Sequence, residues 1–233
     1  MSSDLGTAWS SSRPGWGYRT IRERITAERL GSYLMVTEHD LERAFHLYEW
    51  NINASAGILA TSAMVKVIVR NALDEKLHAW ARRRDPVASW FDIAPMDAKG
   101  YQDIAKARAR ATNDRRQVEI HGKVIAELTL GFWRYLVAPR YHTSLWIPSL
   151  HKAFPDGAQD LRQRRDDVER RLRDLLFVRN RVAHHEPIYR RHLGVDLARM
   201  IELVGWISAD AAAWVAAKSP LGGVVGERPE TGS

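Results

Sequence analysis

Apolar residues recur at helical spacing through most of this chain, and no stretch shows the strong two-residue alternation of a half-buried β-strand. Leu41, Phe45 and Tyr48 begin one long helical pattern that continues through residues 54–84, and residues 158–178 carry a second. Most of the stability of such a helix comes from burying its apolar stripe against other elements. The pattern therefore predicts an all-α protein whose helices form a bundle.

Residues 54–84 are expected to form a buried helix of that bundle. Lys66 and Arg70 interrupt its most apolar part, residues 56–73, so the segment is predicted to be a core helix rather than a membrane span. The apolar positions at helical spacing define the side expected to face the core: Ile58, Leu59, Ala63, Val67, Ile68, Ala72 and Leu77.

Shorter helices are predicted around the two long ones, at residues 18–31, 101–111, 118–137 and 195–217. Two prolines and a glycine predict a loop over residues 85–100. Trp146 and Phe154 are expected to fill the core between short turns, and the aromatic residues of 130–136 are also expected in the core.

These elements predict a single all-helical domain over residues 18–218. Residues 1–17 are rich in Ser and Gly, and residues 219–233 are rich in Gly and Pro, so both are predicted to be disordered.

The formal net charge of +7 favours polyanionic partners without identifying them. The chain has no cysteine, which excludes disulfides and thiolate metal sites and makes a reducing cytoplasm the simplest location. The first 17 residues lack the apolar centre of a signal peptide. We therefore expect a cytoplasmic protein with no membrane segment.

Side chains suited to chemistry gather just after the second long helical pattern: Arg179, Asn180, Arg181, His184, His185, Glu186 and Tyr189. Arginine holds phosphate oxygens with a planar fork, and histidine moves protons near neutral pH because its usual pKa is about 6.5. On a regular helix Arg179 and His184 would lie roughly 140° apart. They would face one pocket only if the helix ended or distorted between them, or if a second chain completed the pocket. Pro187 gives a reason for an end, because it disfavours helical geometry in the preceding residue.

The spacing Arg179-x-x-x-x-His184 resembles the R-x4-H motif of HEPN domains. The longer string around it resembles the Abi-like (AbiD/AbiF-type) abortive-infection proteins of the HEPN superfamily: Arg179-Asn180-Arg181-Val182-Ala183-His184-His185-Glu186-Pro187-Ile188. Further segments resemble that family in the same order: Leu47-Tyr48-Glu49-Trp50-Asn51, Arg70-Asn71-Ala72-Leu73, Lys123-Val124-Ile125-Ala126-Glu127-Leu128, Gly131-Phe132-Trp133, Leu145-Trp146 and Ala153-Phe154-Pro155. The resemblance covers about residues 18–218.

The resemblance implies a HEPN-type helical bundle with additional N-terminal helices and the motif at residues 179–184. It implies a metal-independent endoribonuclease that acts as a toxic effector of abortive infection against phage. The 2′-hydroxyl of RNA would attack the neighbouring phosphorus, with His184 as acid/base, Arg179 as phosphate clamp and Asn180 as polar orienter. It also implies RNA and a second copy of the chain (a homodimer) as partners, with a non-coding RNA or a protein antitoxin as regulator.

Other residues of the same segment keep two interpretations each. His185 and Glu186 either assist the reaction or cap the helix end, where histidine is favourable. Arg181 either reaches a phosphate or is solvated. Tyr189 either stacks on a base or packs in the core.

Two cationic regions lie outside the motif. Arg70 and its neighbour Asn71 lie on or beside the apolar stripe, so Arg70 is either paired with an acid inside the bundle or lines the catalytic groove. The resemblance implies an acid at the position of Lys66; if that acid pairs with Arg70 in the relatives, the pairing is lost here, and Arg70 needs another acid or a phosphate. Residues 106–116 are either a solvated helix face or a track for the RNA backbone, and their cations are Lys106, Arg108, Arg110, Arg115 and Arg116.

No metal or nucleotide cofactor is indicated. His184 and His185 are adjacent and would point in different directions from a helix, and no H-x3-H pair accompanies them. The sequence has no phosphate-binding loop and no dinucleotide fingerprint. Two other function classes stay open: a non-catalytic RNA-binding protein with the same fold, and a structural partner in a toxin–antitoxin pair.

Overall fold

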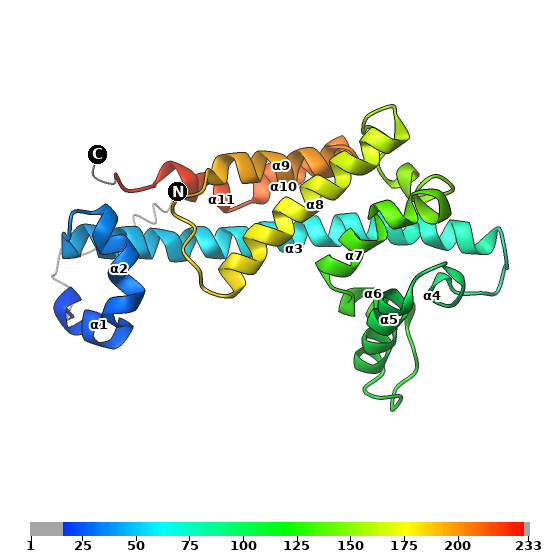
Figure 1. The fold of residues 1–233 in the computed structure, drawn as a ribbon, viewed down its shortest axis with the longest axis horizontal. Helices are drawn as coiled ribbons and strands as arrows, with labels where there is room; N and C mark the ends of the chain where they lie inside the picture. Colours follow the sequence, from blue (N-terminus) through cyan, green and yellow to red (C-terminus); the bar gives the residue numbers. More distant parts are fainter. Residues whose placement is uncertain (1–15, 231–233) are drawn as a thin grey trace, which may run out of the picture. The chain divides into compact units, whose positions relative to one another are not determined.

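The computed structural model describes residues 16–230, which contain helices and turns and no β-strand. The predicted all-α class is therefore confirmed. The described chain divides into two compact units, residues 16–52 with 228–230, and residues 53–227. The helix α3 (Leu41–Arg82) contributes residues to both (Figure 1). Residues 1–15 of the predicted N-terminal arm lie outside the described part, and the single domain over residues 18–218 stays a prediction.

The first unit contains α1 (Tyr18–Ile25), α2 (Ala27–Val36) and the first part of α3. The ring of Tyr18 stacks on Phe45 of α3 with centroids 4.4 Å apart, and its hydroxyl donates to Glu49 at 3.4 Å. Thr26 has a φ of 76° and separates two helices where the sequence predicted one helix over residues 18–31. The Thr26 hydroxyl accepts from the Arg29 amide, which gives α2 its own N-cap.

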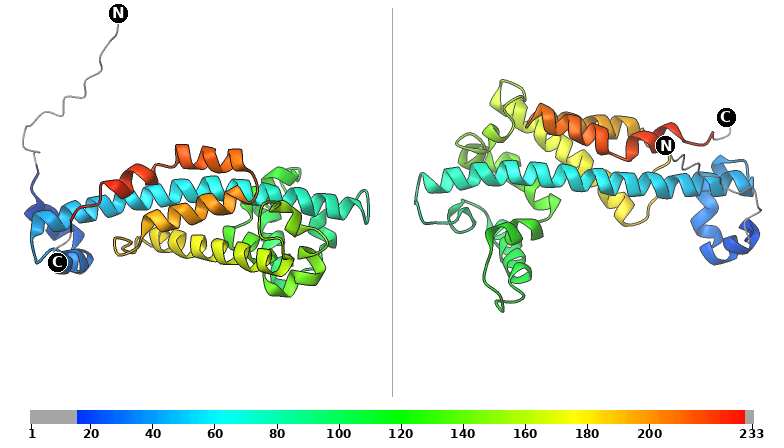
Figure 2. Two further views of the ribbon diagram at one scale, coloured as in Figure 1. Left: turned by 90° about the horizontal axis from the view of Figure 1, so that it is seen from above. Right: turned by 180° about the vertical axis from the view of Figure 1, so that it is seen from behind.

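The second unit begins with the rest of α3 and continues with α4 (Trp90–Ile93), α5 (Ala98–Ala111), α6 (His121–Glu127) and α7 (Leu130–Leu136). Three short turns, η1 (Pro139–Tyr141), η2 (His142–Trp146) and η3 (Leu150–Ala153), lead to α8 (Leu161–Ala183). The unit ends with α9 (Leu193–Gly205), α10 (Ala209–Lys218) and α11 (Leu221–Gly226). Figures 1 and 2 show α8, α9 and α10 beside the middle of α3.

The buried stripe of α3 in this unit is displaced from the predicted one. The apolar residues that are fully buried are Ala54, Ile58, Val65, Val69, Leu73, Leu77 and Ala81. Ile58 and Leu77 confirm the prediction, whereas Leu59 and Val67 are 42% and 41% exposed and Ala63 is exposed too. One residue corresponds to a rotation of about 100°, so the helix presents a neighbouring face to the core and leaves part of its apolar surface in solvent. The predicted positions Ile68 and Ala72 are half-buried.

Two segments differ from the sequence prediction because side chains within them cap the starts of helices. In the predicted loop at residues 85–100, Ser89 accepts from the amide of Phe91 at the start of α4, and Asp97 accepts from that of Gly100 at the start of α5. The single helix predicted over residues 118–137 is instead α6 and α7. Thr129 interrupts it, because its hydroxyl accepts from the Phe132 amide and begins a new helix.

The C-terminal region contains more helices than predicted. The helix expected at residues 195–217 is divided into α9 and α10, since the Ser208 hydroxyl caps α10 by accepting from the Ala211 amide. The tail predicted to be disordered from residue 219 instead forms α11, whose Leu221 is fully buried and lies 3.2 Å (Cα) from the position that a Cβ on Gly57 would occupy. The apolar side chain of Leu221 holds this short helix against α3.

Most of the aromatic residues expected in the core are buried there, whereas Tyr135 is half-buried and its hydroxyl donates to Asp97. Trp146 and Phe154 are fully buried with stacked rings 6.1 Å apart, and the indole nitrogen of Trp146 donates to the carbonyl of Leu161 at 2.7 Å. Phe132 and Trp133 are also buried. These four predictions are confirmed, and the hydrogen bond of Trp146 holds the start of α8 in place.

By length and composition alone, α3 is a helix that could cross a membrane, and 39% of its most apolar window is buried inside the protein. A single helix of this kind is weak support for a membrane protein, because the core helix of a soluble protein can have the same length and composition. The absence of a membrane span stays a prediction.

Asp97 joins the start of α5 to α7 and η1, and it gives the fold a testable dependence on pH. Its carboxylate accepts from the Tyr135 hydroxyl and, at 2.6 Å, from Arg140. The hydrogen bond from Tyr135, with those from the Gly100 amide and Arg140, lowers the pKa of Asp97 to about 2. A carboxyl whose pKa is lowered on folding stabilises the fold above its unfolded pKa and loses this effect as the pH falls through its folded pKa.

We therefore predict that Asp97→Asn lowers the melting temperature at pH 6 and flattens its decline between pH 4 and 2, measured by circular dichroism. Asp156→Asn, at an exposed aspartate whose side chain has no hydrogen bond in the described structure, is the control and should behave as the unmodified chain. Equal pH profiles for all three proteins would contradict the role given to Asp97.

Candidate active site

The helix α8 runs unbroken through Arg179 and ends at Ala183, with His184 as its C-cap. The end is a Schellman motif: the Glu186 amide donates to the Arg181 carbonyl at 2.8 Å, and the His185 amide donates to the Val182 carbonyl at 3.0 Å. His185 has a φ of 57°, in the left-handed region that favours glycine. The helix thus ends at a strained histidine, before Pro187 is reached.

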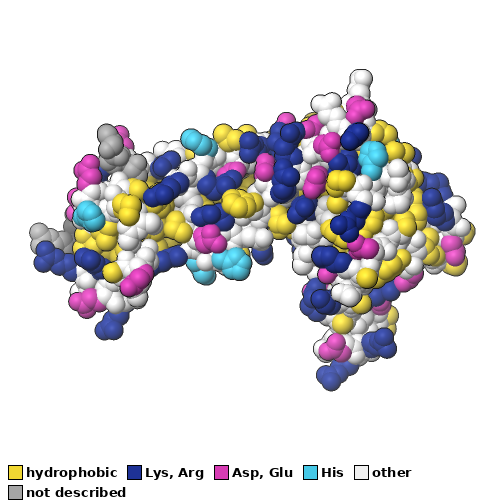
Figure 3. All heavy atoms as spheres, viewed as in Figure 1, with side chains coloured by type: hydrophobic (Ala, Val, Ile, Leu, Met, Phe, Trp, Pro, Cys, Tyr) yellow, Lys and Arg dark blue, Asp and Glu magenta, His cyan; other side chains and the backbone are white. Residues whose placement is uncertain are grey.

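His184 and His185 are both exposed at this helix end. Figure 3 shows histidine side chains at the surface near the end of α8, on a face that also carries many Lys and Arg side chains. Strained non-glycine residues are concentrated at functional sites, where surrounding structure maintains them. The backbone of His185 favours the interpretation of this residue as part of the helix cap. Glu186 is exposed, and its backbone amide donates a hydrogen bond within the same cap.

Arg181 and Tyr189 have structural positions. The guanidinium of Arg181 donates to the Pro187 carbonyl at 3.1 Å, lies 3.4 Å from the Glu186 carboxylate and sits over the Phe177 ring. Arg181 therefore holds the loop that follows α8. The sequence had suggested either contact with a phosphate or solvation, and this structural role is neither of them. Tyr189 is 2% exposed, which favours packing over stacking on a base.

Arg179 lies on a different side of α8 from His184. Because the helix is unbroken between them, five helical positions separate the two side chains by about 140°. No hydrogen bond or ion pair joins them in the described structure; the Arg179 guanidinium instead donates to the neighbouring Asn180 side chain at 3.2 Å. The helix ends at Ala183, directly before His184, and this end does not join the two side chains within one chain; completion of the pocket by a second chain stays a prediction.

Lys66 and Arg70 lie one turn apart on α3, and the charge of Arg179 on α8 also acts on Lys66. Lys66 is half-buried, and its ammonium donates to the Ala126 carbonyl at 3.4 Å. Burial lowers the pKa of Lys66, the positive charges of Arg70 and Arg179 lower it further, and only Glu127 acts in the opposite direction. Arg70 donates to the side chain of its neighbour Asn71 at 3.2 Å. None of the three cations has a carboxylate within ion-pair distance among residues 16–230.

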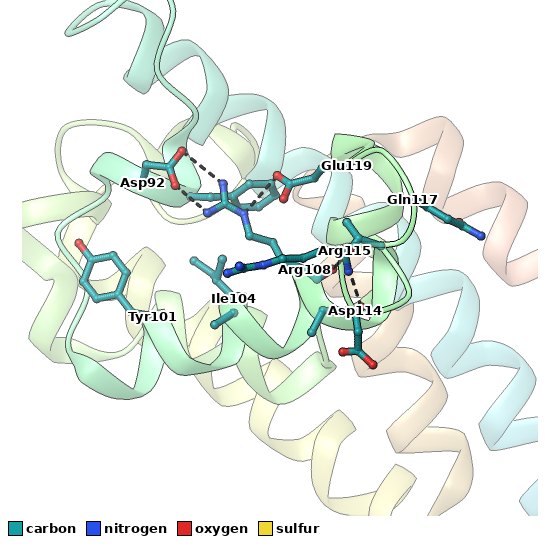
Figure 4. Close-up of a pocket in the computed structure, with 12 residues that line it drawn as sticks. Asp92, Tyr101, Ile104, Arg108, Asp114, Arg115, Gln117 and Glu119 are labelled. Atoms are coloured by element: carbon teal, nitrogen blue, oxygen red, sulfur yellow. Dashed lines mark hydrogen bonds and ion pairs between the residues drawn. The ribbon is translucent and has the colours of Figure 1, made fainter.

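The cations of residues 106–116 are arranged differently. Arg108 is held by both Asp92 (2.7 Å) and Glu119 (3.1 Å), and its guanidinium lies over the Phe91 ring (Figure 4). Arg110 pairs with Glu127 at 2.8 Å. Of the five cations proposed for an RNA track, these two are therefore neutralised by acids from outside the segment. The exposed cations that are left are Lys106, Arg115 and Arg116.

Arg108 lines a cavity of about 730 Å³ beside α5. Figure 4 shows its wall formed by Arg108 with its two acids on one side and Tyr101 and Ile104 on another. The cavity has two acids bound to one arginine, so it lacks the excess positive charge of a phosphate site. It is separate from the residues of the motif.

Sequence reasoning missed an acid–histidine pair. One carboxylate oxygen of Asp74 on α3 accepts from the Trp90 indole nitrogen and contacts a ring nitrogen of His121, each at 2.8 Å. The three residues lie on α3, α4 and α6, up to 47 positions apart, so spacing along the chain gives no signal for them. The pair ties these helices together. Lys66, in contrast, could be singled out from the sequence, because it is a lysine at a position where the resemblance implies an acid.

Among the described residues, no group of three His, Asp or Glu side chains is arranged to hold a metal ion. A metal-independent site stays a prediction. No protein-family model, no curated protein and no solved structure matches the chain. The resemblance to the Abi-like HEPN proteins thus rests on the sequence segments quoted above.

The strained backbone at His185 separates its role from that of His184. His185→Gly should stabilise the protein by about 0.5–1 kcal/mol, because glycine adopts a positive φ without a steric penalty and the gain exceeds its added entropy. Urea unfolding measures this change. His192→Gly is the matched control at an exposed histidine with an ordinary negative φ of −83°, and it should not stabilise. Destabilisation by His185→Gly would show that the imidazole makes a contact the fold needs.

Proposed function

We propose that this chain is a metal-independent endoribonuclease of the Abi-like HEPN type, acting as a toxic effector in abortive infection. The observation that carries the proposal is that Arg179 on α8, and Lys66 and Arg70 on α3, donate to neutral oxygens and have no ion pair in the described structure, while His184 is exposed at the end of α8. Phosphate contacts supply most of the affinity of a protein for nucleic acid. The resemblance supplies the class of reaction.

The proposed reaction uses the nucleophile that RNA carries. A base takes the proton of a 2′-hydroxyl, whose oxygen attacks the adjacent phosphorus, and the bond to the 5′-oxygen breaks as an acid protonates that oxygen. The products are a 2′,3′-cyclic phosphate and a 5′-hydroxyl. His184 exchanges the protons, and Arg179 holds the phosphate oxygens as negative charge develops on them. Asn180 orients Arg179 through the hydrogen bond between them.

Because Arg179 and His184 diverge on one helix, we propose that two copies of the chain form the cleft. The exposed apolar face of α3 is suited to self-association. Leu59 and Val67 flank Ala63, four residues to each side, so a two-fold axis near Ala63 would place Leu59 of one copy on Val67 of the other. The small side chain of Ala63 allows two helices to approach closely. Lys66 and Arg70 lie at the edge of the same face, next to the proposed cleft.

The cleavage test uses end-labelled RNA in excess EDTA with the purified full chain. The unmodified protein should leave fragments that end in 2′,3′-cyclic phosphates. His184→Ala should lower the rate about 10²- to 10⁴-fold, as expected for loss of a general acid or base. Arg179→Ala should lower it about 10²- to 10³-fold through loss of charge stabilisation. His192→Ala is the control, because this exposed histidine makes no capping hydrogen bond at the start of α9.

Intact RNA after incubation with the unmodified chain would favour the alternative function, a non-catalytic RNA-binding protein. In that case RNA stays intact with every variant, and binding survives His184→Ala but weakens steeply as the salt concentration rises. Equal cleavage by the unmodified chain and His184→Ala would remove His184 from the chemistry.

The dimer test is independent of cleavage. Leu59→Glu with Val67→Glu should raise the dimer dissociation constant by roughly 100-fold or more, because it places two carboxylates in an apolar interface. Sedimentation equilibrium at micromolar concentration measures this. Val118→Glu is the control, since Val118 lies outside α3 and is 83% exposed. A monomeric unmodified chain, or an unchanged dimer in the double variant, would contradict the proposed interface.

A further inference from the structure

Phe177 is an aromatic residue near the end of α8 that is 51% exposed. Two guanidinium groups lie over its ring, that of Arg181 at 5.8 Å from the ring centroid and that of Arg191 at 5.2 Å. A single exposed phenylalanine is ordinary on a protein surface. This ring, however, is the centre of a cluster of three flat groups, which come from α8 and from the segment between α8 and α9.

Both guanidiniums of the cluster are fixed in place by other groups. Arg191 donates to the two carboxylate oxygens of Asp196, at 3.0 and 2.7 Å, and Asp196 itself is buried. Arg181 donates to the Pro187 carbonyl at 3.1 Å and lies 3.4 Å from the Glu186 carboxylate. Little side-chain freedom is therefore left to lose when a ligand stacks on the cluster, which favours binding.

The acids also balance the charge of the cluster. Each arginine has its own carboxylate, Glu186 for Arg181 and Asp196 for Arg191. The cluster thus offers flat surfaces without an excess of positive charge, which suits an uncharged planar ligand better than a phosphate. Single-stranded RNA is recognised by the stacking of its unpaired bases on aromatic rings and on guanidinium planes. A nucleobase matches both kinds of group in the cluster.

The cluster lies on the side of α8 that leads to His184. Arg181 follows Phe177 by four residues and His184 follows it by seven, and positions with this spacing share one face of a helix. The helical hydrogen bonds reach His184, whose amide donates to the Asn180 carbonyl at 3.0 Å. Seven residues span about 10 Å along the helix axis. Arg179 follows Phe177 by only two residues, so it points to another side of α8.

We propose that Phe177, with Arg181 and Arg191, forms a stacking platform for an RNA base near the phosphate that is cleaved. The platform deepens the proposed function and rests on it for the identity of the ligand as RNA. Its role is binding: the ring of Phe177 holds a base, while His184 exchanges the protons. Every base has a flat face, so the platform gives affinity for single-stranded RNA without a strong preference for sequence.

The first experiment measures binding of a single-stranded RNA to the purified full chain by fluorescence anisotropy. Methyl groups on all 2′-oxygens remove the nucleophile, so the RNA is not cleaved. Phe177→Leu keeps an apolar side chain without a flat ring, and it should weaken binding about 5- to 150-fold, as expected for loss of one stacked base. Phe177→Tyr restores the ring and should restore the affinity. Trp214→Leu is the matched control, at an aromatic residue of α10 that is 48% exposed, and it should bind as the unmodified chain.

Equal RNA affinities of the unmodified chain, Phe177→Leu and Trp214→Leu would overturn the platform, and so would the absence of RNA binding by the unmodified chain. A second ligand, with the same methylated backbone and no bases, separates loss of stacking from a general defect. The unmodified chain and Phe177→Leu should bind it equally. If Phe177→Leu loses as much affinity for this ligand as for the RNA, the variant has lost more than a stacked base and the platform is overturned.

Phe177 is also tested as a contact between copies of the chain. Sedimentation equilibrium should give the same dimer dissociation constant for Phe177→Leu and the unmodified chain. A weaker dimer in Phe177→Leu would assign the ring to the contact between copies and overturn the platform.

Cleavage distinguishes the platform from the proposed function. Phe177→Leu should raise KM and leave kcat nearly unchanged, because a stacked base is bound equally before and during the reaction. Cleavage by the unmodified chain, together with normal binding of the methylated RNA by Phe177→Leu, would keep the function and overturn the platform. Binding that depends on Phe177 in a chain that cleaves no RNA would keep the platform and reject the nuclease.

Discussion

The burial of one face of α3 organises the second unit. A helix of 42 residues is about 63 Å long and gains most of its stability from packing, because propensity alone adds little. The other helices attach to it at intervals through polar contacts as well as apolar ones. Thr61 shares a hydrogen bond of 2.7 Å with Ser219 after α10, and Asp74 receives Trp90 and His121 from α4 and α6. The rotation of α3 about its axis therefore decides which side chains line the site.

The sequence prediction was wrong about part of the buried face of α3, which this rotation sets. Ile58 and Leu77 lie on the buried side, but Leu59, Ala63 and Val67 do not. The helix is apolar over a wide arc, so helical spacing alone does not single out the face that meets the other helices. The surplus apolar arc is informative in itself, since it lies next to Lys66 and Arg70 where the proposed dimer cleft would form.

Other differences from the sequence predictions have local causes. Helix starts at Ser89, Asp97, Thr129 and Ser208 depend on single side-chain oxygens that accept backbone amides, and each divides or begins a helix inside a segment that looked uniform. Burial of Leu221 against α3 turns a predicted tail into α11. The aromatic core was predictable, because Phe132, Trp133, Trp146 and Phe154 are large apolar side chains with few alternatives to burial.

The charges of the candidate site show a further limit of reasoning from the chain alone. A count over residues 106–116 gave an excess of positive charge, but Arg108 and Arg110 are neutralised by acids that are distant in sequence. Lys66, Arg70 and Arg179, spread over two helices, have no ion pair in the described structure, and neither do Lys106, Arg115 and Arg116 of the basic segment. A polyanion is attracted by charge that the fold has not already neutralised. Charge alone therefore does not single out one segment, and it is the proposed reaction at Arg179 and His184 that makes the end of α8 the stronger candidate for contact with RNA.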